Sequence, residues 1–222
     1  MKNSLRMFCI AAVFIMTGAA VVTAAQDNIA APAADSNKPD YYSLVKKLKS
    51  NDTNIDFAAL RLSYAKTKDY MPYGGDESAK DAAFDALNKK NYAEALKQAE
   101  IVLAKNYVDM EMHLLSFIAC RESGNAGKAA FHRSVFKGLL NSLAASGDGT
   151  APESAMVVIS VPEEYSFFRA NGFKPGKQSK ITVNGHDYDK MEVVNKNTGE
   201  NKIFYFNIDI PIQWLEKSLQ KK

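Results

Sequence analysis

The sequence has few cysteines, and their positions exclude a fold held together by disulfide bonds. Its 222 residues include two cysteines, Cys9 and Cys120. Cys9 lies in an N-terminal segment that we expect to be removed, so the mature chain keeps one thiol and no internal disulfide. Small secreted scaffolds depend on such cross-links, whereas a chain of this length can bury a hydrophobic core without them.

The sequence also lacks an excess of charge of either sign. It has 28 Lys and Arg residues against 25 Asp and Glu residues. Residues 1–25 contain two of the basic residues and no acidic residue, which leaves 26 basic residues against 25 acidic ones in the mature chain. Because nucleic acids and anionic lipids attract strongly basic surfaces, we expect no nucleic-acid partner.

Long apolar runs are absent except at the N-terminus, where residues 1–25 read as a secretory signal peptide. Lys2 and Arg6 precede the apolar run Phe8–Val22, and small residues stand before a cleavage point ahead of Gln26. The run is short for a transmembrane helix, which needs about 20 residues. We therefore expect an exported protein, periplasmic or secreted, with no stable membrane span after cleavage. An uncleaved N-terminal signal anchor is the alternative.

Composition divides the rest of the chain into three parts. Residues 26–38 are rich in Ala, Asn, Asp and Ser and have no apolar periodicity, which predicts a flexible linker. Residues 39–145 have helical periodicity. A turn-rich stretch then leads into residues 146–222, an α+β region. We expect residues 39–222 to form one compact unit.

Two helical hairpins of similar sequence are predicted in the middle of the chain. Tyr92 and Ala126 lie 34 residues apart, and Ala95 and Ala129 repeat that spacing. This is the period of tetratricopeptide (TPR) helix–turn–helix units. Two TPR-like pairs are fewer than the roughly three repeats of a free-standing array, so they need packing from other elements. The predicted helices begin near residues 39, 56 and 76 and then cover 92–105, 109–121 and 126–143.

The second half predicts the element order β-α-β-β-β-α. Asn184-Gly185 is a strong two-residue hairpin signal, and residues 202–208 are apolar on both faces, which favours a central strand. The fold class is therefore α+β, with an N-terminal helical part packed on a small C-terminal antiparallel sheet with two helices. The predicted strands are 155–161, 179–183, 188–194 and 202–208, and the helices are 162–169 and one from Pro211.

Several short motifs follow one another over residues 40–216. They are Phe57-Ala58-Ala59-Leu60-Arg61 with Tyr64, Tyr70-Met71-Pro72-Tyr73, Gly147-Asp148-Gly149 with Pro152-Glu153-Ser154-Ala155, Glu163-Glu164-Tyr165, and Tyr205-Phe206-Asn207-Ile208-Asp209 with Trp214-Leu215. In this order the chain resembles the DUF4919 family of bacterial proteins of unknown function. The resemblance implies an exported bacterial protein with helices first and a sheet second. It implies no known reaction and no catalytic residues.

The histidines and the remaining cysteine do not form a recognisable metal or nucleophile site. His113, His132 and His186 lack a metal-ligand spacing such as His-x-x-x-His. Cys120 lies two turns from His113 on one predicted helix, among apolar residues that are typical of a small core side chain. We expect His186 to be solvated after the hairpin turn, and we expect neither a metal nor a cofactor.

The acidic motifs have structural explanations. Asp148 lies between two glycines but lacks the alternating acidic positions of a cation-binding loop, so we expect it to cap backbone amides of its own turn. Glu163 and Glu164 are adjacent on a helix and point about 100° apart, which prevents them from sharing a substrate easily. Their place just after Pro162 suits the positive end of a helix.

Tyrosines around the Pro72–Gly75 turn are the most open candidates for binding. Tyrosine combines an apolar ring with a polar tip, which suits peptides or glycans, although burial that holds the turn onto neighbouring helices is the alternative. Asn207, Asp209 and the loop of residues 147–152 are expected at the junction of helices and sheet. The possible binding surface therefore comprises Tyr64, Tyr70, Tyr73, Asp148, Asn207 and Asp209.

The sequence predicts a protein that is not an enzyme, because no catalytic constellation is recognisable. Helical repeats often form extended binding surfaces. We therefore expect a cell-envelope protein that binds a protein or peptide partner through its helical surface. The alternative is an enzyme or a small-ligand-binding protein with a pocket at the helix–sheet junction.

Overall fold

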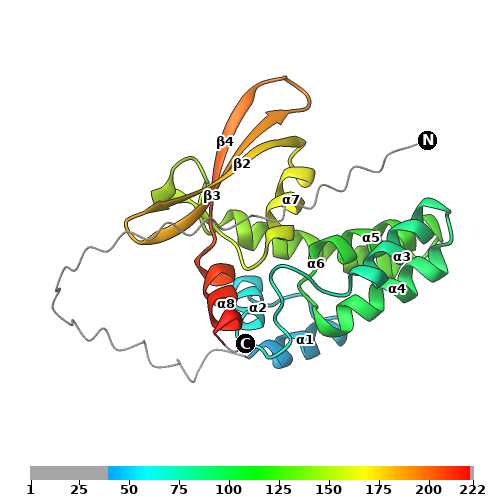
Figure 1. Ribbon diagram of the computed structural model, residues 1–222. Coiled ribbons are helices and arrows are strands. Elements are labelled where there is room, and N and C mark those ends of the chain that lie inside the picture. Colours follow the sequence, from blue (N-terminus) through cyan, green and yellow to red (C-terminus); the bar gives the residue numbers. More distant parts are fainter. Residues whose placement is uncertain (1–39, 221–222) are drawn as a thin grey trace. The chain divides into compact units, whose positions relative to one another are not determined.

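The computed structural model describes residues 40–220 of the chain (Figure 1). Over this range there are eight α-helices, a short 3-10 helix and four β-strands. The predicted α+β class is therefore confirmed. The predicted signal peptide and linker, residues 1–25 and 26–38, lie outside the described residues.

The first half of the described chain is helical. Asp or Asn side chains stand at the start of every one of these six helices and accept a backbone N–H from the first turn, at Asp40, Asp56, Asp76, Asn91, Asp109 and Asn125. These caps explain why the helix starts predicted from the sequence agree closely with those in the structure. The helices are α1 (Tyr41–Lys49), α2 (Phe57–Tyr64), α3 (Glu77–Asn88), α4 (Tyr92–Lys105), α5 (Met110–Glu122) and α6 (Ala126–Ala144).

The turns inside the α3–α4 and α5–α6 hairpins have the same backbone structure. Lys90 and Gly124, 34 residues apart, both adopt positive φ angles, 59° and 80°. In each turn the next residue donates its N–H back to the preceding helix, from Asn91 to Ala86 and from Asn125 to Cys120, both at 2.8 Å. This is the hydrogen-bond pattern of a Schellman cap. The spacing in the sequence therefore marks a repeated helix–turn–helix unit.

The second half contains a four-stranded sheet with the order β1-β4-β3-β2. Strand β4 lies between β1 and β3, so the prediction of a central strand is confirmed. The sheet is mixed rather than wholly antiparallel, because β1 pairs with β4 in parallel, Met156 opposite Phe206. The elements are η1 (Pro152–Ser154), β1 (Met156–Val157), α7 (Val161–Ala170), β2 (Phe173–Val183), β3 (His186–Asn195), β4 (Asn201–Asn207) and α8 (Asp209–Leu219).

The parallel pair follows from the path of the chain. Helix α7 carries the chain from β1 to β2, and such a crossover returns it in the same direction. Two antiparallel steps, β2 to β3 and β3 to β4, then restore the direction of β1. The sequence pattern predicted only the antiparallel pairing, because a strand of two residues such as β1 is too short for a periodic signal that would indicate its parallel partner.

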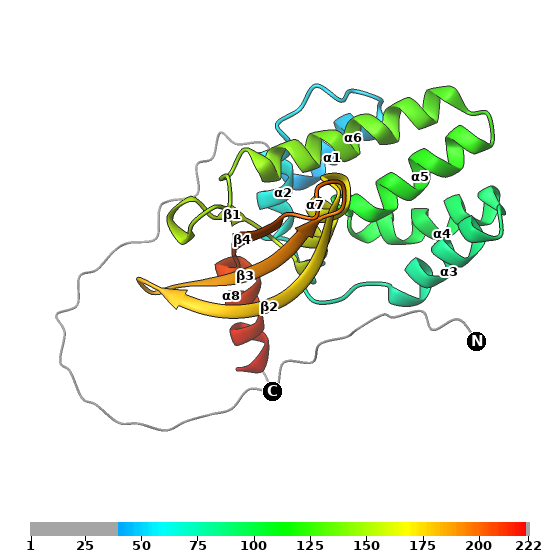
Figure 2. The ribbon, with the colours of Figure 1, turned by 90° about the horizontal axis from the view of Figure 1, so that it is seen from above.

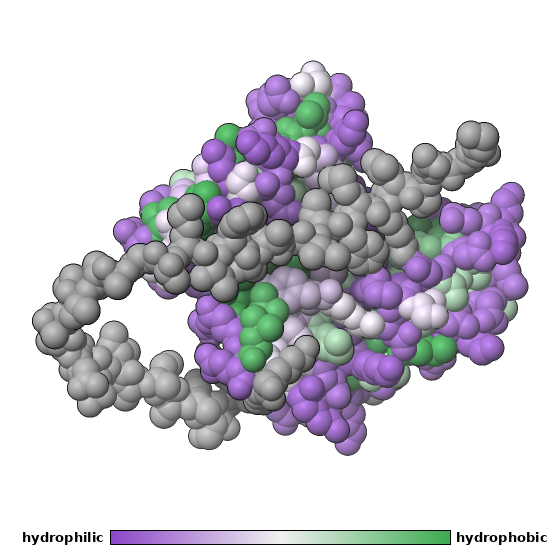
Figure 3. All heavy atoms as spheres, in the orientation of Figure 1, coloured by the Kyte–Doolittle hydropathy of each residue, from purple (hydrophilic) through white to green (hydrophobic). Residues whose placement is uncertain are grey.

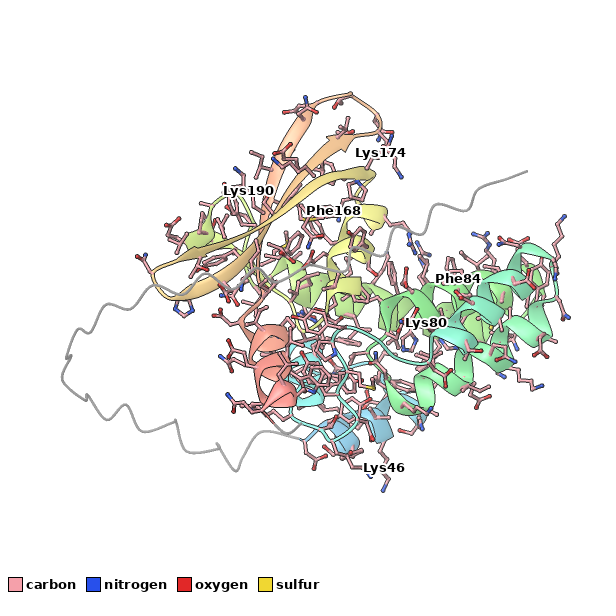
Figure 4. All side chains as sticks on the ribbon, in the orientation of Figure 1. Lys46, Lys80, Phe84, Phe168, Lys174 and Lys190 are labelled. Atoms are coloured by element: carbon pink, nitrogen blue, oxygen red, sulfur yellow. The ribbon has the colours of Figure 1, made fainter. Side chains whose placement is uncertain are left out.

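Helix α7 packs between the sheet and the helical half. It contacts β2 on one side and α5 and α6 on the other (Figures 1 and 2). Phe167 and Phe168 of α7 meet Phe204 and Phe206 of β4 with ring centroids 5.4–6.1 Å apart. Figure 4 shows Phe168 in the layer between α7 and the strands. These rings make the core of the sheet side continuous with the helical core.

A glycine in the middle of α6 allows α2 to approach closely. A Cβ atom on Gly138 would lie 2.3 Å from the ring of Phe57, far inside van der Waals contact. Phe57 therefore packs directly on the α6 backbone, and α2 is held against α6 by this contact.

The described residues differ in polarity from one region to another. Figure 3 shows a mainly hydrophilic surface over the α3–α4 hairpin and a hydrophobic patch in the region of α8 and α2. No helix within residues 40–220 is long and apolar enough to cross a bilayer.

Candidate functional site

The predicted tyrosine cluster is mostly part of the core. Tyr64 and Tyr70 are each 3% exposed, and their hydroxyls donate to the backbone carbonyls of Asp69 and Ile159. Tyr70 also meets Trp214 of α8 edge to face, with ring centroids 6.3 Å apart. These two tyrosines hold the turn after α2 against its neighbours, as the structural alternative predicted.

Tyr73 is the member of the cluster that reaches the surface. It is 44% exposed, and its ring packs against that of Trp214 with the ring centroids 6.4 Å apart. Burial, and then the charges of Asp189 and Glu164, raise the pKa of Tyr73 to about 12. Tyr73 therefore stands as a neutral side chain beside a group of carboxyls.

A buried ion pair ties α2 to α7. The guanidinium of Arg61 donates to both oxygens of Glu163, at 2.8 and 2.7 Å, and both residues are at most 3% exposed. Arg61 also donates to the carbonyl of Val157, and Glu163 accepts the backbone N–H of Ile159, each at 2.9 Å. A paired, fully hydrogen-bonded arrangement is the form in which buried charge is tolerated.

This network corrects the predicted strand 155–161. Its backbone groups at Val157 and Ile159 bond to side chains of α2 and α7 rather than to a neighbouring strand. Helix α7 then begins at Val161, with Pro162 in its first turn. Strand β1 is therefore limited to Met156–Val157.

Glu164 points to a different partner from Glu163. It has no exposed surface, and no donor among residues 40–220 hydrogen-bonds either of its carboxyl oxygens. Burial, and then the charge of Asp189, hold the pKa of Glu164 well above its usual value. Burial also raises the pKa of Asp189, which accepts a hydrogen bond from Gln178 at 2.7 Å.

The raised pKa values mean that burial favours the protonated, neutral form of both carboxyl groups. The effect is larger for Glu164, which has no exposed surface, than for Asp189, which is 6% exposed. Such pairs serve acid–base chemistry when a substrate can reach them. Here Glu164 has no exposed surface, so a substrate does not reach it in this conformation.

The predicted junction residues form a separate cluster at the start of α8. Asp209 accepts hydrogen bonds from the backbone N–H of Asp187 at 2.8 Å and from the side chain of Asn207 at 3.1 Å. Its second oxygen lies 2.6 Å from Nδ1 of His186. His186 is exposed, as predicted, and folding of the hairpin against α8 also gives it an acidic partner.

Asp148 closes its own loop. Its Oδ1 accepts from the Ser154 hydroxyl at 2.6 Å and from the backbone N–H and hydroxyl of Thr150 at 2.9 and 2.8 Å. These bonds lower the pKa of Asp148. The local capping predicted from the sequence is therefore observed. Within residues 40–220, no three His, Cys, Asp or Glu side chains are grouped so as to hold a metal ion.

One groove opens where the turn after α2 meets α3 and α4; we call it the loop groove. It has a volume of about 440 Å³ and is lined by Tyr64, Lys68, Asp76, Lys80, Lys105 and Asp109, among others. Its charges are largely paired already. Lys80, labelled in Figure 4, bonds Asp109 at 2.8 Å, and Lys105 bonds Asp76 at 3.1 Å.

A second groove, of about 490 Å³, lies along the helical part; we call it the helix groove. Its walls come from the end of α1, from α4, and from the first turns of α6. Its lining includes both apolar and charged side chains. The lining residues include Leu48, Lys49, Leu96, Glu100, Leu103, Tyr107, Lys128, Phe131 and His132.

A histidine pair stands at the edge of the helix groove. His113 is fully buried, and its Nε2 lies 3.0 Å from the carbonyl oxygen of Tyr107. Its Nδ1 lies 3.1 Å from Nδ1 of His132. Burial, and then the neighbouring imidazole, lower the pKa of His113 to about 3, and burial followed by Lys128 lowers that of His132 to about 4. Both rings are therefore neutral at pH 7.

The hydrogen bonds determine where the protons are. A carbonyl only accepts, so His113 must donate from Nε2 and present a bare Nδ1. His132 then donates from its Nδ1 and keeps an unprotonated Nε2, because a neutral imidazole has a single N–H. The imidazole that lines the helix groove therefore offers a hydrogen-bond acceptor.

Cys120 is a core side chain, as predicted. It has no exposed surface, and burial raises the pKa of its thiol, so the thiolate needed for nucleophilic chemistry is disfavoured.

Sequence reasoning missed the two buried cations and the histidine contact, although each has a signal. Arg61 and Lys80 occupy positions in the apolar stripes of α2 and α3, where a charge implies a buried partner. His113 lies nine residues before the end of α5, and His132 six residues after the start of α6. In an antiparallel helical hairpin, residues at similar distances from the turn lie side by side.

Comparison with known proteins places the chain in context. The model of the family described as "Domain of unknown function (DUF4919)" matches residues 27–217. No curated protein and no solved structure matches the chain.

Proposed function

The chain belongs to the DUF4919 family, and from that premise we propose that it is a non-catalytic binding module that takes an extended peptide of a partner protein into the helix groove. The observation that carries this proposal is the groove itself. It has a volume of about 490 Å³, within the range of ligand-binding clefts. The 34-residue spacing of the two equivalent hairpin turns supports a TPR-like repeat, and repeats of that kind commonly present binding surfaces to peptides.

The character of the lining supports a peptide rather than a polar metabolite. Leu96, Leu103 and Phe131 give an apolar floor, while Lys49 and Glu100 stand at the rim. Peptide-binding grooves combine apolar contacts for side chains with polar groups that fix orientation.

We further propose that the protein acts in the cell envelope. The N-terminal pattern of Lys2, Arg6 and the apolar run supports export. N-terminal sequencing of the protein isolated from its native envelope tests this part. A new terminus near Gln26 is expected, and an intact Met1 would instead favour the signal anchor.

A peptide library displayed on phage tests the binding function. Ala104 is exposed and lines the helix groove, so Ala104→Trp fills the groove without disturbing the core. Ala93→Trp places the same side chain on an exposed position of α4 outside the lining. We expect enriched peptides that bind the wild type and Ala93→Trp but not Ala104→Trp. If no enriched peptide is sensitive to Ala104→Trp, the proposal fails.

A small-ligand function in the loop groove is the second candidate. A narrow cavity of about 20 Å³, with room for about one water molecule, shares lining residues such as Lys80 and Asp109 with this groove and is also lined by Glu163 and Ser166. This gives the groove a polar inner end at the helix–sheet junction. Native mass spectrometry of protein from its own host tests it. A bound small molecule that Gly74→Trp displaces would favour this candidate.

A further inference from the structure

We infer that the helix groove selects acidic peptides, with Lys49 and Lys128 binding peptide carboxylates and Nε2 of His132 accepting a peptide N–H. This inference rests on the proposed function and specifies the chemistry of its partner. It is carried by the placement of two unpaired cations and of the imidazole acceptor of His132 beside apolar lining residues.

The two lysines come from different walls of the groove. Lys49 is the last residue of α1, and Lys128 lies in the first turn of α6. Both are exposed, and neither has an ion-pair partner among residues 40–220, whereas the lysines of the loop groove at positions 80 and 105 do. Glu100 is the single carboxylate among the described lining residues. The groove therefore carries uncompensated positive charge although the chain as a whole is nearly neutral.

Lys49 is directed into the groove. Its Nζ lies over the ring of Tyr107, 5.6 Å from the ring centroid, and Tyr107 is itself a lining residue. A cation–π contact of this kind holds the ammonium in place without neutralising it. A carboxylate that enters the groove can therefore bond Lys49 while the aromatic contact is kept.

His132 supplies the complementary acceptor. Its Nδ1 is occupied by His113, so the orientation and tautomer of the ring are set by a buried neighbour rather than by solvent. An extended peptide presents alternating N–H groups and side chains. One N–H can bond Nε2 of His132 while the flanking side chains reach Lys128 and the apolar floor at Leu96 and Phe131.

Fluorescence anisotropy with three labelled peptides tests the inference. The probes share alternating leucines and differ only in the intervening residues, which are Glu in the first, Gln in the second and Lys in the third. Each partly exposed ion pair strengthens binding about threefold, so two should make the Glu probe about tenfold tighter than the Gln probe. The Lys probe should bind more weakly than either.

Variants of the groove locate the effect. Lys49→Gln and Lys128→Gln should each weaken binding of the Glu probe about threefold, and higher salt should narrow the difference between probes. Lys137→Gln is the matched control, because Lys137 is exposed on α6 outside the lining. The double reversal Lys49→Glu with Lys128→Glu should make the Lys probe the tighter ligand.

The results separate this inference from the proposed function. Equal affinities of the Glu and Gln probes, with binding still lost in Ala104→Trp, overturn the acidic preference and leave a peptide groove. Loss of the preference in Lys137→Gln to the same extent as in Lys49→Gln also overturns it, because the charge would then act from outside the groove. The proposed function fails separately, if the phage library yields no peptide sensitive to Ala104→Trp.

Discussion

Replacing His113 should change how the stability of the protein depends on pH. The folded protein holds the pKa of His113 at about 3, whereas the ordinary value is 6.5. Between these two pH values, His113 is protonated in the unfolded chain but stays neutral in the folded protein. The contribution of His113 to stability is therefore fully present above pH 6.5 and is lost progressively as the pH falls toward 3.

The size of this loss follows from the difference in pKa. Each pH unit below the unfolded value costs about 1.4 kcal/mol until the folded group also titrates. At about pH 4.5 the buried His113 alone should therefore lower the free energy of unfolding by roughly 3 kcal/mol relative to neutral pH. His132 adds a smaller amount, since it is partly solvated.

His113→Gln keeps a donor for the Tyr107 carbonyl but has no proton to gain. We expect this substitution to lower the free energy of unfolding at pH 7 by about 1–2 kcal/mol, because the glutamine side chain does not reproduce the hydrogen bond of the imidazole with His132. The fall in stability between pH 7 and 4.5 should then be about 3 kcal/mol smaller than in the wild type. Urea unfolding followed by far-UV circular dichroism at both pH values measures this.

Leu139→Ala is the matched control for destabilisation as such. Leu139 lies on α6 with no exposed surface, and its truncation should cost about 2–5 kcal/mol at either pH through the cavity it leaves. It should leave the pH dependence unchanged. If His113→Gln shows the same fall between pH 7 and 4.5 as the wild type, the reasoning about the neutral histidine pair is wrong.

Three further experiments probe the junction and the packing of α2. Gly138→Ala should lower the free energy of unfolding by about 1–3 kcal/mol because the added methyl group forces α2 and α6 apart. The control Gly127→Ala, with open space around it, should be neutral or stabilising by up to about 1 kcal/mol. Equal thermal denaturation midpoints for the two variants would contradict the close contact between Phe57 and the α6 backbone. Arg61→Leu should lower the free energy of unfolding by about 3–5 kcal/mol because it leaves the buried carboxylate of Glu163 unpaired, and adding Glu163→Leu should restore much of that stability. A double-mutant cycle measured by chemical denaturation tests this, and additive losses of the two substitutions would count against the pairing. Glu164→Gln should match the wild type near pH 4.5 and become more stable than it by roughly 1–3 kcal/mol at pH 7, because the raised pKa of Glu164 makes the wild type lose stability as pH rises. Urea titrations that show no such divergence would refute the raised pKa of Glu164.

Local signals made the helices predictable. Asp56, Asp76 and Asn91 cap helices whose apolar residues recur with helical period, and capping and periodicity act within a few residues. The hairpin signal at Asn184-Gly185 likewise placed the turn between β2 and β3 correctly.

Features that depend on distant residues could not be predicted in the same way. The short β1 results from side chains of Arg61 and Glu163 that occupy its backbone groups. The early start of β2 at Phe173 was hidden by an irregularity between Pro175 and Gln178, which interrupts the alternation on which strand prediction depends. The helix groove brings together residues of α1, α4 and α6, from Leu48 to His132, an arrangement that no local pattern encodes.

The long reach of the junction contacts bears on the order in which the molecule folds. Arg61 and Glu163 are 102 residues apart, and Tyr70 and Ile159 are 89 apart, whereas the two hairpin turns close over a few residues. Contacts of short sequence separation form quickly and distant ones slowly. The segments that wall the helix groove, from Leu48 to His132, can therefore associate while the later part of the chain is still being synthesised. Strand β4, which gives β1 its partner, is the last strand of the chain, so the sheet is completed only after the helical part has formed.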